Sequence, residues 1–518
     1  MIKRLFAIGF FSFIGLTMYA QSDLLISNND KIIGKNDKTN SDIHAMEYVF
    51  PERIYDSYID TLSNLLTIQL RKVSNNGKWL KNSGNVVLYD LSNKKVKWSK
   101  KIKYRLSSIE QFNNVIIQRK GNASYCLNNE NGKDLWKVQD AIYYVNSFEK
   151  IGIGYKYNIY NGSYTNNLEG IDLTNGKTIW HREINREYSW NDILHLNDSV
   201  IVAAAAGLHS INIKNGTGWD YNTITGKKDY DATIAANAAG VAVGLLTGAF
   251  IISTGHDLIR DIVSNVLIDS SDIYFASKEK IARLDYNGNI KWTHTLPKDL
   301  VSKSVILFKD SLIYMINKGY AYMGYRQLDF GMPFIAAFNK NTGEQVFLTI
   351  VKDKKNPVNG IKINNDTAIL VFDDRISKYS MINGSAIYEK TFNTDVLGEL
   401  MYFINEQIYI KTDSAFKCLV TSDPTKKYLC TKGKKILVID NDLNISDQID
   451  FCDLYIYYFK TKNYKFLSKD DETTVIDNEN KKVADLKISR EATLIGSKLY
   501  DMQEKSLIEV DINEFMKN

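Results

Sequence analysis

The feature that most constrains the fold is a tight turn followed, at a fixed spacing, by an aromatic residue. In "IDLTNGKTIW", Gly176 follows Asp172 by four residues, and Trp180 follows Gly176 by four. Asn-Gly supplies the positive φ angles of a tight turn, and the alternating apolar segments before several turns bury one face, so each copy predicts a β-hairpin. The same frame recurs as Gly132 with Trp136, Gly288 with Trp292, Gly343 with Phe347 and Gly384 with Tyr388, and with Lys94 in place of glycine before Trp98.

These turns recur at about the length of one propeller blade. The centres from Lys94 to Gly384, with Gly216 included, are separated by 38, 44, 40, 72, 55 and 41 residues, and weaker turns lie near Asp442 and Asn480. A unit of roughly 40 residues with about four short strands is the period of a β-propeller blade. We therefore predict an all-β propeller over residues 55–513, with about eight four-stranded blades and a range of seven to nine.

The repeated aromatic residues are expected to fill the gaps between blades. A blade cannot bury both of its faces alone, so its neighbours must stack on it. A large aromatic side chain at a constant place in each blade is suited to that gap. We therefore assign a structural role in the repeat to Trp98, Trp136, Trp180, Trp292, Phe347 and Tyr388.

The frame A-x-D-x-x-x-G-x-x-x-W resembles the tryptophan-docking repeat of the pyrroloquinoline-quinone-like propeller family. Gly170 to Trp180 match it with Gly for the first Ala, and Ala337 to Phe347 match it with Asn for Asp and Phe for Trp. The resemblance covers most of the chain from about Asn64 onward. It implies a family that includes quinoprotein alcohol dehydrogenases and a non-enzymatic scaffold of the outer-membrane barrel-assembly machinery. Because the motif is structural, it indicates fold more strongly than activity.

The sequence predicts no catalytic residue, no cofactor and no metal. The resemblance implies that a quinoprotein enzyme would carry a vicinal disulfide and a calcium ion near a catalytic Asp, but no two cysteines are adjacent. The acidic clusters at Asp373-Asp374 and Asp470-Asp471-Glu472 lack the spacing of a calcium loop and are interpreted as solvated turns. No H-E-x-x-H, G-x-S-x-G or G-x-x-x-x-G-K-[ST] segment occurs.

The N-terminus has the pattern of a secretory signal peptide. A basic start precedes an apolar run from Leu5 to about Leu16, and Ala20 stands before a polar residue. An uncleaved N-terminal anchor is the alternative. We expect a signal peptide in residues 1–20, a lead-in segment in residues 21–54, and a periplasmic or secreted protein associated with the envelope.

Export also makes disulfides available. Cys418 and Cys430 flank the turn-forming stretch "TSDPTK", which would place them opposite each other across a hairpin. Two outcomes are open for this pair: a disulfide across the hairpin, or buried free thiols.

An apolar, glycine-rich segment interrupts the repeat. The 72-residue interval exceeds one blade by about 30 residues. Residues 232–255 contain no charge, and Gly240, Gly244 and Gly248 stand four apart. On a helix, these glycines form one stripe that another backbone can approach closely. We predict a helical insertion at residues 231–263 that packs within the chain; the alternatives are a partner or membrane contact through residues 232–255 and an irregular buried loop.

The overall charge argues against nucleic acid as a partner. Lys and Arg total 65 against 60 Asp and Glu, with no long basic run. We expect an exported, non-enzymatic β-propeller that serves as a protein-binding or scaffolding module of the cell envelope, although no feature of the sequence names its partner. The alternatives are a quinoprotein-like oxidoreductase and a membrane-associated protein that uses the glycine-rich insertion.

Overall fold

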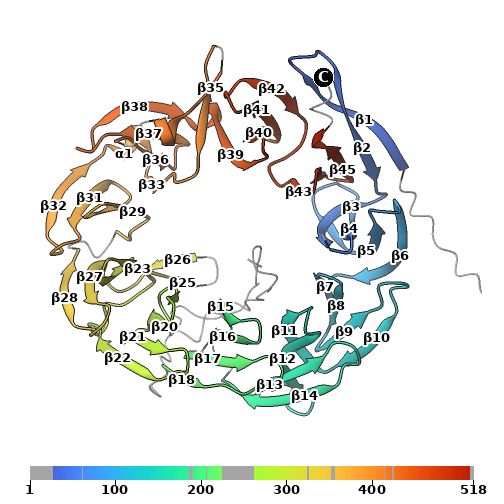
Figure 1. The fold of residues 1–518 in the computed structure, drawn as a ribbon, viewed down its shortest axis with the longest axis horizontal. Helices are drawn as coiled ribbons and strands as arrows, with labels where there is room; N and C mark the ends of the chain where they lie inside the picture. Colours follow the sequence, from blue (N-terminus) through green and yellow to red (C-terminus); the bar gives the residue numbers. More distant parts are fainter. Residues whose placement is uncertain are drawn as a thin grey trace, which may run out of the picture.

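The chain folds into a ring of small antiparallel sheets (Figure 1). The computed structural model describes residues 27–513, apart from residue 61 and residues 186–189, 191, 206, 224–261, 324–325, 352–355, 414 and 423–424. The described helical turns are short: α1 (Thr394–Leu397), α2 (Leu419–Ser422) and the 3-10 turn η2 (Phe451–Asp453). The predicted all-β fold of four-stranded blades is therefore confirmed. The predicted signal peptide and nearly all of the predicted insertion at residues 231–263 lie outside the described residues.

The first five blades each contain four consecutive strands. Blade 1 contains β3 (Arg53–Asp60), β4 (Leu65–Val73), β5 (Leu80–Asp90) and β6 (Lys95–Lys103). Blade 2 contains β7 (Ser107–Phe112), β8 (Val115–Lys120), β9 (Ala123–Leu127) and β10 (Asp134–Val138). Blade 3 contains β11 (Asp140–Asn146), β12 (Ile151–Asn158), β13 (Ser163–Asp172) and β14 (Thr178–Glu183). Blade 4 contains β15 (Asp192–Asn197), β16 (Val200–Ala205), β17 (Gly207–Asn212) and β18 (Asp220–Asn222), and blade 5 contains β19 (Leu267–Ile268), β20 (Asp272–Ala276), β21 (Lys280–Asp285) and β22 (Ile290–Thr295).

Blades 6 to 8 keep this order, but two of them include an inserted hairpin. Blade 6 contains β23 (Ser304–Lys309), β24 (Leu312–Asn317), β27 (Phe334–Asn339) and β28 (Gln345–Ile350), while β25 (Tyr320–Met323) and β26 (Arg326–Asp329) form a separate sheet. Blade 7 contains β29 (Gly360–Asn364), β30 (Thr367–Val371), β31 (Arg375–Ser380) and β32 (Ala386–Thr391). Blade 8 contains β33 (Leu400–Phe403), β36 (Lys427–Thr431), β37 (Lys435–Ile439) and β38 (Ile445–Asp450), while β34 (Ile408–Lys411) and β35 (Phe416–Cys418) join the next blade.

The N-terminal strands close the ring. Blade 9 contains β39 (Leu454–Lys460), β40 (Tyr464–Lys469), β41 (Glu472–Asp477) and β42 (Lys482–Leu486). Blade 10 contains β43 (Thr493–Ile495), β44 (Lys498–Met502) and β45 (Ser506–Asp511), and its fourth strand is β2 (Asp42–Val49), which pairs with β45. The hairpin partner of β2, β1 (Ser27–Asn36), pairs with β42 and so joins blades 9 and 10 in one eleven-stranded sheet.

The described residues therefore form ten four-stranded blades, where the sequence predicted about eight. Eight are separate four-stranded sheets, and two more lie within the eleven-stranded sheet. The last two blades lack the complete frame: Asp485 stands where blade 9 would carry its aromatic residue, and the outer strand of blade 10 comes from the other end of the chain. Part of the segment expected as a lead-in, residues 27–49, thus supplies strands of the fold.

Tryptophan side chains join neighbouring blades. Trp180 in β14 of blade 3 is buried, and its Nε1–H donates to the carbonyl oxygen of Ile213 in blade 4 at 2.9 Å. Gly216 has a φ of +74°, and a Cβ built there would lie 2.5 Å from Cε3 of Trp180, so glycine allows the ring to lie against the turn. The corresponding bonds of 2.8 to 3.0 Å run from Trp98 to Asn129, Trp136 to Leu173, Trp219 to Tyr286 and Trp292 to Lys340.

Trp219 is a docking residue that the predicted frame misses. It follows Gly216 by three residues, one fewer than in the frame. Its ring lies against Gly288 in the turn of blade 5, in the place that Trp180 occupies against Gly216. A search for Asn-Gly followed by an aromatic residue at either three or four positions would have found it.

Phe347 and Tyr388 depart from this pattern. The half-buried Phe347 ring lies against Gly384 but has no N–H group to donate. Tyr314 in β24 supplies the missing donor, because its hydroxyl donates to the carbonyl oxygen of Met381 at 2.8 Å. Tyr388 is 46% exposed. Between blades 7 and 8 a hydrogen bond comes from another residue of blade 7, because the ammonium group of Lys378 donates to the carbonyl oxygen of Asn441 in blade 8.

Replacing Trp180 with alanine tests this contact. Trp180→Ala should lower the free energy of unfolding by about 3 to 5 kcal/mol, the range for deleting a large buried aromatic side chain. Urea unfolding measures the change. Tyr160→Ala is the control, because Tyr160 is 95% exposed, and it should change stability by less than about 0.5 kcal/mol. Equal unfolding midpoints for Trp180→Ala and the wild type would contradict the assignment.

Candidate binding groove between blades 8 and 9

Blades 8 and 9 meet without an inter-blade aromatic residue on the outer strand. In blade 8, Asp440 and Asn444 take the places of the Asp and Gly of the repeated frame. The aromatic place, four residues later, is taken by Gln448, which is exposed, whereas earlier blades carry Trp or Phe there. The hairpin β34–β35 fills this space, since β34 leaves blade 8 and pairs with β39 of blade 9. The backbone N–H of Phe416 donates to the carbonyl oxygen of Asn480, in the turn of blade 9, at 2.8 Å.

Buried aromatic side chains hold the hairpin in place. The ring of Phe416 is buried and meets the ring of Tyr455 edge-on, with 4.9 Å between their centroids. Tyr428, in β36, donates its hydroxyl to the carbonyl oxygen of Leu419 at 2.9 Å. The hairpin is therefore attached to both blades, and a groove remains beside it.

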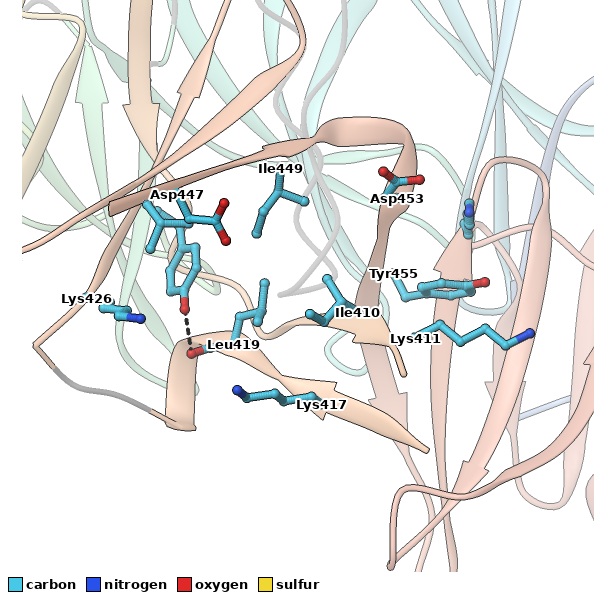
Figure 2. Close-up of a pocket in the computed structure, with 12 residues that line it drawn as sticks. Ile410, Lys411, Lys417, Leu419, Lys426, Asp447, Ile449, Asp453 and Tyr455 are labelled. Atoms are coloured by element: carbon cyan, nitrogen blue, oxygen red, sulfur yellow. Dashed lines mark hydrogen bonds between the residues drawn. The ribbon is translucent and has the colours of Figure 1, made fainter. Parts of the chain in front are cut away.

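The groove has a volume of about 700 Å³ and an apolar floor (Figure 2). Ile410 and Leu419 come from the hairpin side, and Val438 and Ile449 come from blade 8. Leu419 and Val438 are buried, whereas Ile410 and Ile449 are half-buried and line the opening. This floor offers apolar contact to a ligand that enters from solvent.

Charged side chains surround the floor. The exposed Lys411 and Lys417 belong to the hairpin, and Asp447 lies across the groove on β38 (Figure 2). The ammonium group of Lys469 lies 5.0 Å from the centroid of the half-buried Tyr455 ring, a cation–π arrangement. The groove thus presents lysine and aspartate side chains around an apolar surface.

A smaller cavity of about 270 Å³ lies near the hairpin and includes Tyr409 and Cys418 in its lining. Burial raises the pKa of the Tyr409 hydroxyl to about 12, and the neighbouring Cys418 adds to this effect. The hydroxyl is therefore protonated at neutral pH and suited to hydrogen bonding, not to proton transfer.

The predicted hairpin between Cys418 and Cys430 is wrong. Cys418 lies in β35, which pairs with β34, whereas Cys430 lies in β36, which pairs with β33 and β37. Both residues are free thiols, as are Cys126 and Cys452. Burial raises the pKa of the Cys430 thiol, so this group stays protonated and unreactive at neutral pH.

The sequence also raised the questions of a metal site, a membrane contact and a glycine stripe. In the part of the chain that the structure describes, no three His, Cys, Asp or Glu side chains converge as a metal site. No helix among the described residues is long and apolar enough to cross a membrane. Gly240, Gly244 and Gly248 lie outside the described residues.

Blade 3 contains a cluster of buried charges. Asp140 is 5% exposed, and its Oδ1 has no hydrogen-bond partner among the described residues. Nearby, the buried Glu169 accepts bonds of 2.8 Å from both Lys156 and Thr178. Burial, reinforced by the charge of Glu169, raises the pKa of Asp140 to about 7. This cluster of buried charges therefore bears on the stability of blade 3.

Comparison with known proteins finds a family model that matches part of the chain. Residues 73–293 match the family model described as "Outer membrane protein assembly factor BamB". The resemblance to the pyrroloquinoline-quinone-like propeller repeat family is thereby confirmed over residues 73–293. No curated protein matches the chain.

Solved structures are similar to the chain at low identity. BamB from Moraxella catarrhalis is 11% identical, with 73% of this chain and 96% of that chain covered and a TM-score of 0.31. The computationally designed Ika8 protein is 11% identical, with 71% and 94% covered and a TM-score of 0.27. The β-propeller domain of Cps50 (Swd1) from Myceliophteria thermophila is 9% identical, with 74% and 97% covered and a TM-score of 0.26. These scores add nothing to the fold assignment, which depends on the strand order.

The buried Asp140 predicts a pH dependence of stability. The pKa of Asp140 is about 7 in the folded protein and 3.8 for a solvated Asp. The free energy that this carboxyl group contributes to folding is therefore fully present below about pH 4 and is lost as the pH rises through about 7. Asp140→Asn should remove this loss and raise the free energy of unfolding at pH 8 by on the order of 2 to 4 kcal/mol relative to its effect at pH 4. Urea unfolding at both pH values measures the difference. The exposed Asp198→Asn is the control, and an equal pH dependence in Asp140→Asn and the wild type would contradict the prediction.

Proposed function

We propose that this chain is an exported, non-enzymatic β-propeller that acts as a protein-binding or scaffolding module of the cell envelope. The observation that carries the proposal is the match of residues 73–293 to the model described as an outer membrane protein assembly factor. The signal-peptide pattern of residues 1–20 supports a periplasmic or secreted location at the envelope.

The groove between blades 8 and 9 supports a protein as the ligand. Its floor of Ile410, Leu419, Val438 and Ile449 accepts apolar side chains, and its charged rims orient a segment that carries both signs of charge. The exposed Lys411 and Lys417 place the hairpin side of the groove at the protein surface, where an extended peptide segment can enter. We infer that the partner inserts an extended segment with apolar and charged side chains.

Capture from envelope membranes tests this function. The purified protein is immobilised and exposed to detergent-solubilised envelope membranes, and the bound proteins are identified. Lys411→Glu with Lys417→Glu reverses the charge of the hairpin rim, and Lys133→Glu with Lys177→Glu is the matched control on exposed turns of blades 2 and 3. We expect the wild type and the control to retain the same partner and the groove variant to retain at least about fivefold less, the factor for 1 kcal/mol of lost interaction.

The outcomes separate this function from its alternatives. Equal capture by the groove variant and the control would contradict binding at the groove. A quinoprotein-like oxidoreductase would instead copurify with a chromophore and reduce a dye in the presence of calcium. Loss of capture only when residues 232–255 are deleted would favour the alternative in which the glycine-rich segment makes the contact.

A further inference from the structure

Blade 1 holds a concentration of positive charge that the overall composition conceals. Between Leu70 and Leu106 there are eleven Lys and Arg residues and one acidic residue, Asp90, whereas the whole chain carries a net charge of only +5. The remaining residues therefore carry a net negative charge. Several cations of blade 1 are exposed and belong to β4, β5 and β6 and their connections.

The β4–β5 hairpin extends farther than the corresponding hairpins of neighbouring blades. β4 has nine residues and β5 has eleven, whereas β8 and β9 of blade 2 have six and five. Three extra residues lengthen a strand by about 10 Å. The turn closes where the Ser74 N–H donates to the carbonyl oxygen of Trp79 at 2.8 Å, so Trp79 lies at the tip.

Arg71, near the far end of β4, ties this hairpin to the rest of blade 1. The guanidinium group of Arg71 lies 4.6 Å from the ring centroid of Tyr55 and 5.3 Å from that of Tyr104. Arg71 also donates to the carbonyl oxygens of Leu80 and Lys81 at 3.1 and 2.9 Å. These contacts, all within blade 1, hold the end of the hairpin in place.

The tip combines exposed apolar side chains with cations. Trp79 is 61% exposed, although Trp is normally buried, and the connection to blade 2 exposes Leu106. Lys103 pairs with Ser83 in the sheet, and the N–H of Tyr104 donates to the carbonyl oxygen of Asn82, so the end of β6 lies beside the hairpin. The surface formed by Lys78, Trp79, Lys81, Lys103, Arg105 and Leu106 is called the blade 1 tip below.

The cations of the blade 1 tip are not neutralised within the described chain. Lys78, Lys103 and Arg105 form no ion pair with any described residue, and Lys81 donates only to the side chain of Asn75. In contrast, Lys97 and Lys100 on the same blade pair with Glu130 and Asp134 at 2.8 and 2.7 Å. The unneutralised charge is thus concentrated beside the exposed Trp79.

We propose that the blade 1 tip binds the surface of a bilayer that contains anionic phospholipids. Lysine and arginine attract anionic headgroups, and tryptophan partitions to the boundary between headgroups and acyl chains. The longer β4 and β5 carry Lys78, Trp79 and Lys81 beyond the end of the corresponding hairpin of blade 2, where they can reach a membrane surface. Because vesicles contain no protein, this contact is tested independently of partner binding at the groove.

Cosedimentation with vesicles tests the proposal. The purified protein should bind vesicles of phosphatidylcholine with phosphatidylglycerol, release them as salt is raised, and bind vesicles of phosphatidylcholine alone at least tenfold more weakly. The triple variant Lys78→Glu, Lys81→Glu and Lys103→Glu should bind at least about 100-fold more weakly, from about fivefold per cation. The triple variant Lys133→Glu, Lys177→Glu and Lys462→Glu makes the same change on exposed turns of other blades and should bind like the wild type.

Fluorescence locates the contact. Brominated phosphatidylcholine should quench part of the tryptophan emission of the wild type, and Trp79→Phe should remove that quenching while the unfolding midpoint stays the same. Equal binding by the two triple variants, or quenching that persists in Trp79→Phe, would overturn the proposal. Binding of soluble polyglutamate as tight as binding of the vesicles, with no quenching by the brominated lipid, would overturn it in favour of an acidic protein partner.

Discussion

The ring depends on an indole ring that lies against a glycine turn of the next blade. A four-stranded sheet of five- and six-residue strands buries too little surface to be stable alone. In five blades a tryptophan ring fills the gap to the next blade, and its indole N–H donates to a carbonyl oxygen in the turn of that blade. These residues are Trp98, Trp136, Trp180, Trp219 and Trp292. The contact therefore combines apolar burial with a directional hydrogen bond, which sets the position of each blade relative to the next.

One of the proposed binding features lies where this repeated contact is replaced, and the other lies in a blade that keeps the contact but has longer strands. Between blades 8 and 9, Gln448 stands in place of the aromatic residue, so a hairpin inserts and leaves an open groove beside it. In blade 1, the inter-blade residue Trp98 is retained, and β4 and β5 are longer than the corresponding strands of blade 2. Blades that keep the repeated contact and ordinary strand lengths thus form the scaffold. The two departures from that pattern form the surfaces proposed to bind other molecules.

The sequence predicted those parts of the fold that local spacing encodes. Asp, Gly and Trp at intervals of four lie within one hairpin, so the blades that carry the frame could be found without the structure. Trp219 was missed because its turn is one residue shorter. The tenth blade pairs Val49 with Ser506, and no local pattern reports a contact over that separation. Neither candidate site was foreseen. The groove was missed because Cys418 was assigned to a hairpin with Cys430, whereas it lies in β35, which pairs with β34. The blade 1 tip was missed because the net charge of the whole chain combines the cations of blade 1 with acidic residues elsewhere.

A double-mutant cycle between Trp180 and Gly216 tests the central claim most directly, since it isolates the contact from the separate cost of each substitution. Trp180→Ala, Gly216→Ala and the double variant are compared with the wild type by urea unfolding. Because the Cβ added at Gly216 clashes with the indole ring, removing the ring should relieve part of its cost. We expect the double variant to lose at least about 1 kcal/mol less stability than the sum of the single variants, within the usual range for residues in contact. Additivity to within about 0.5 kcal/mol would contradict the account.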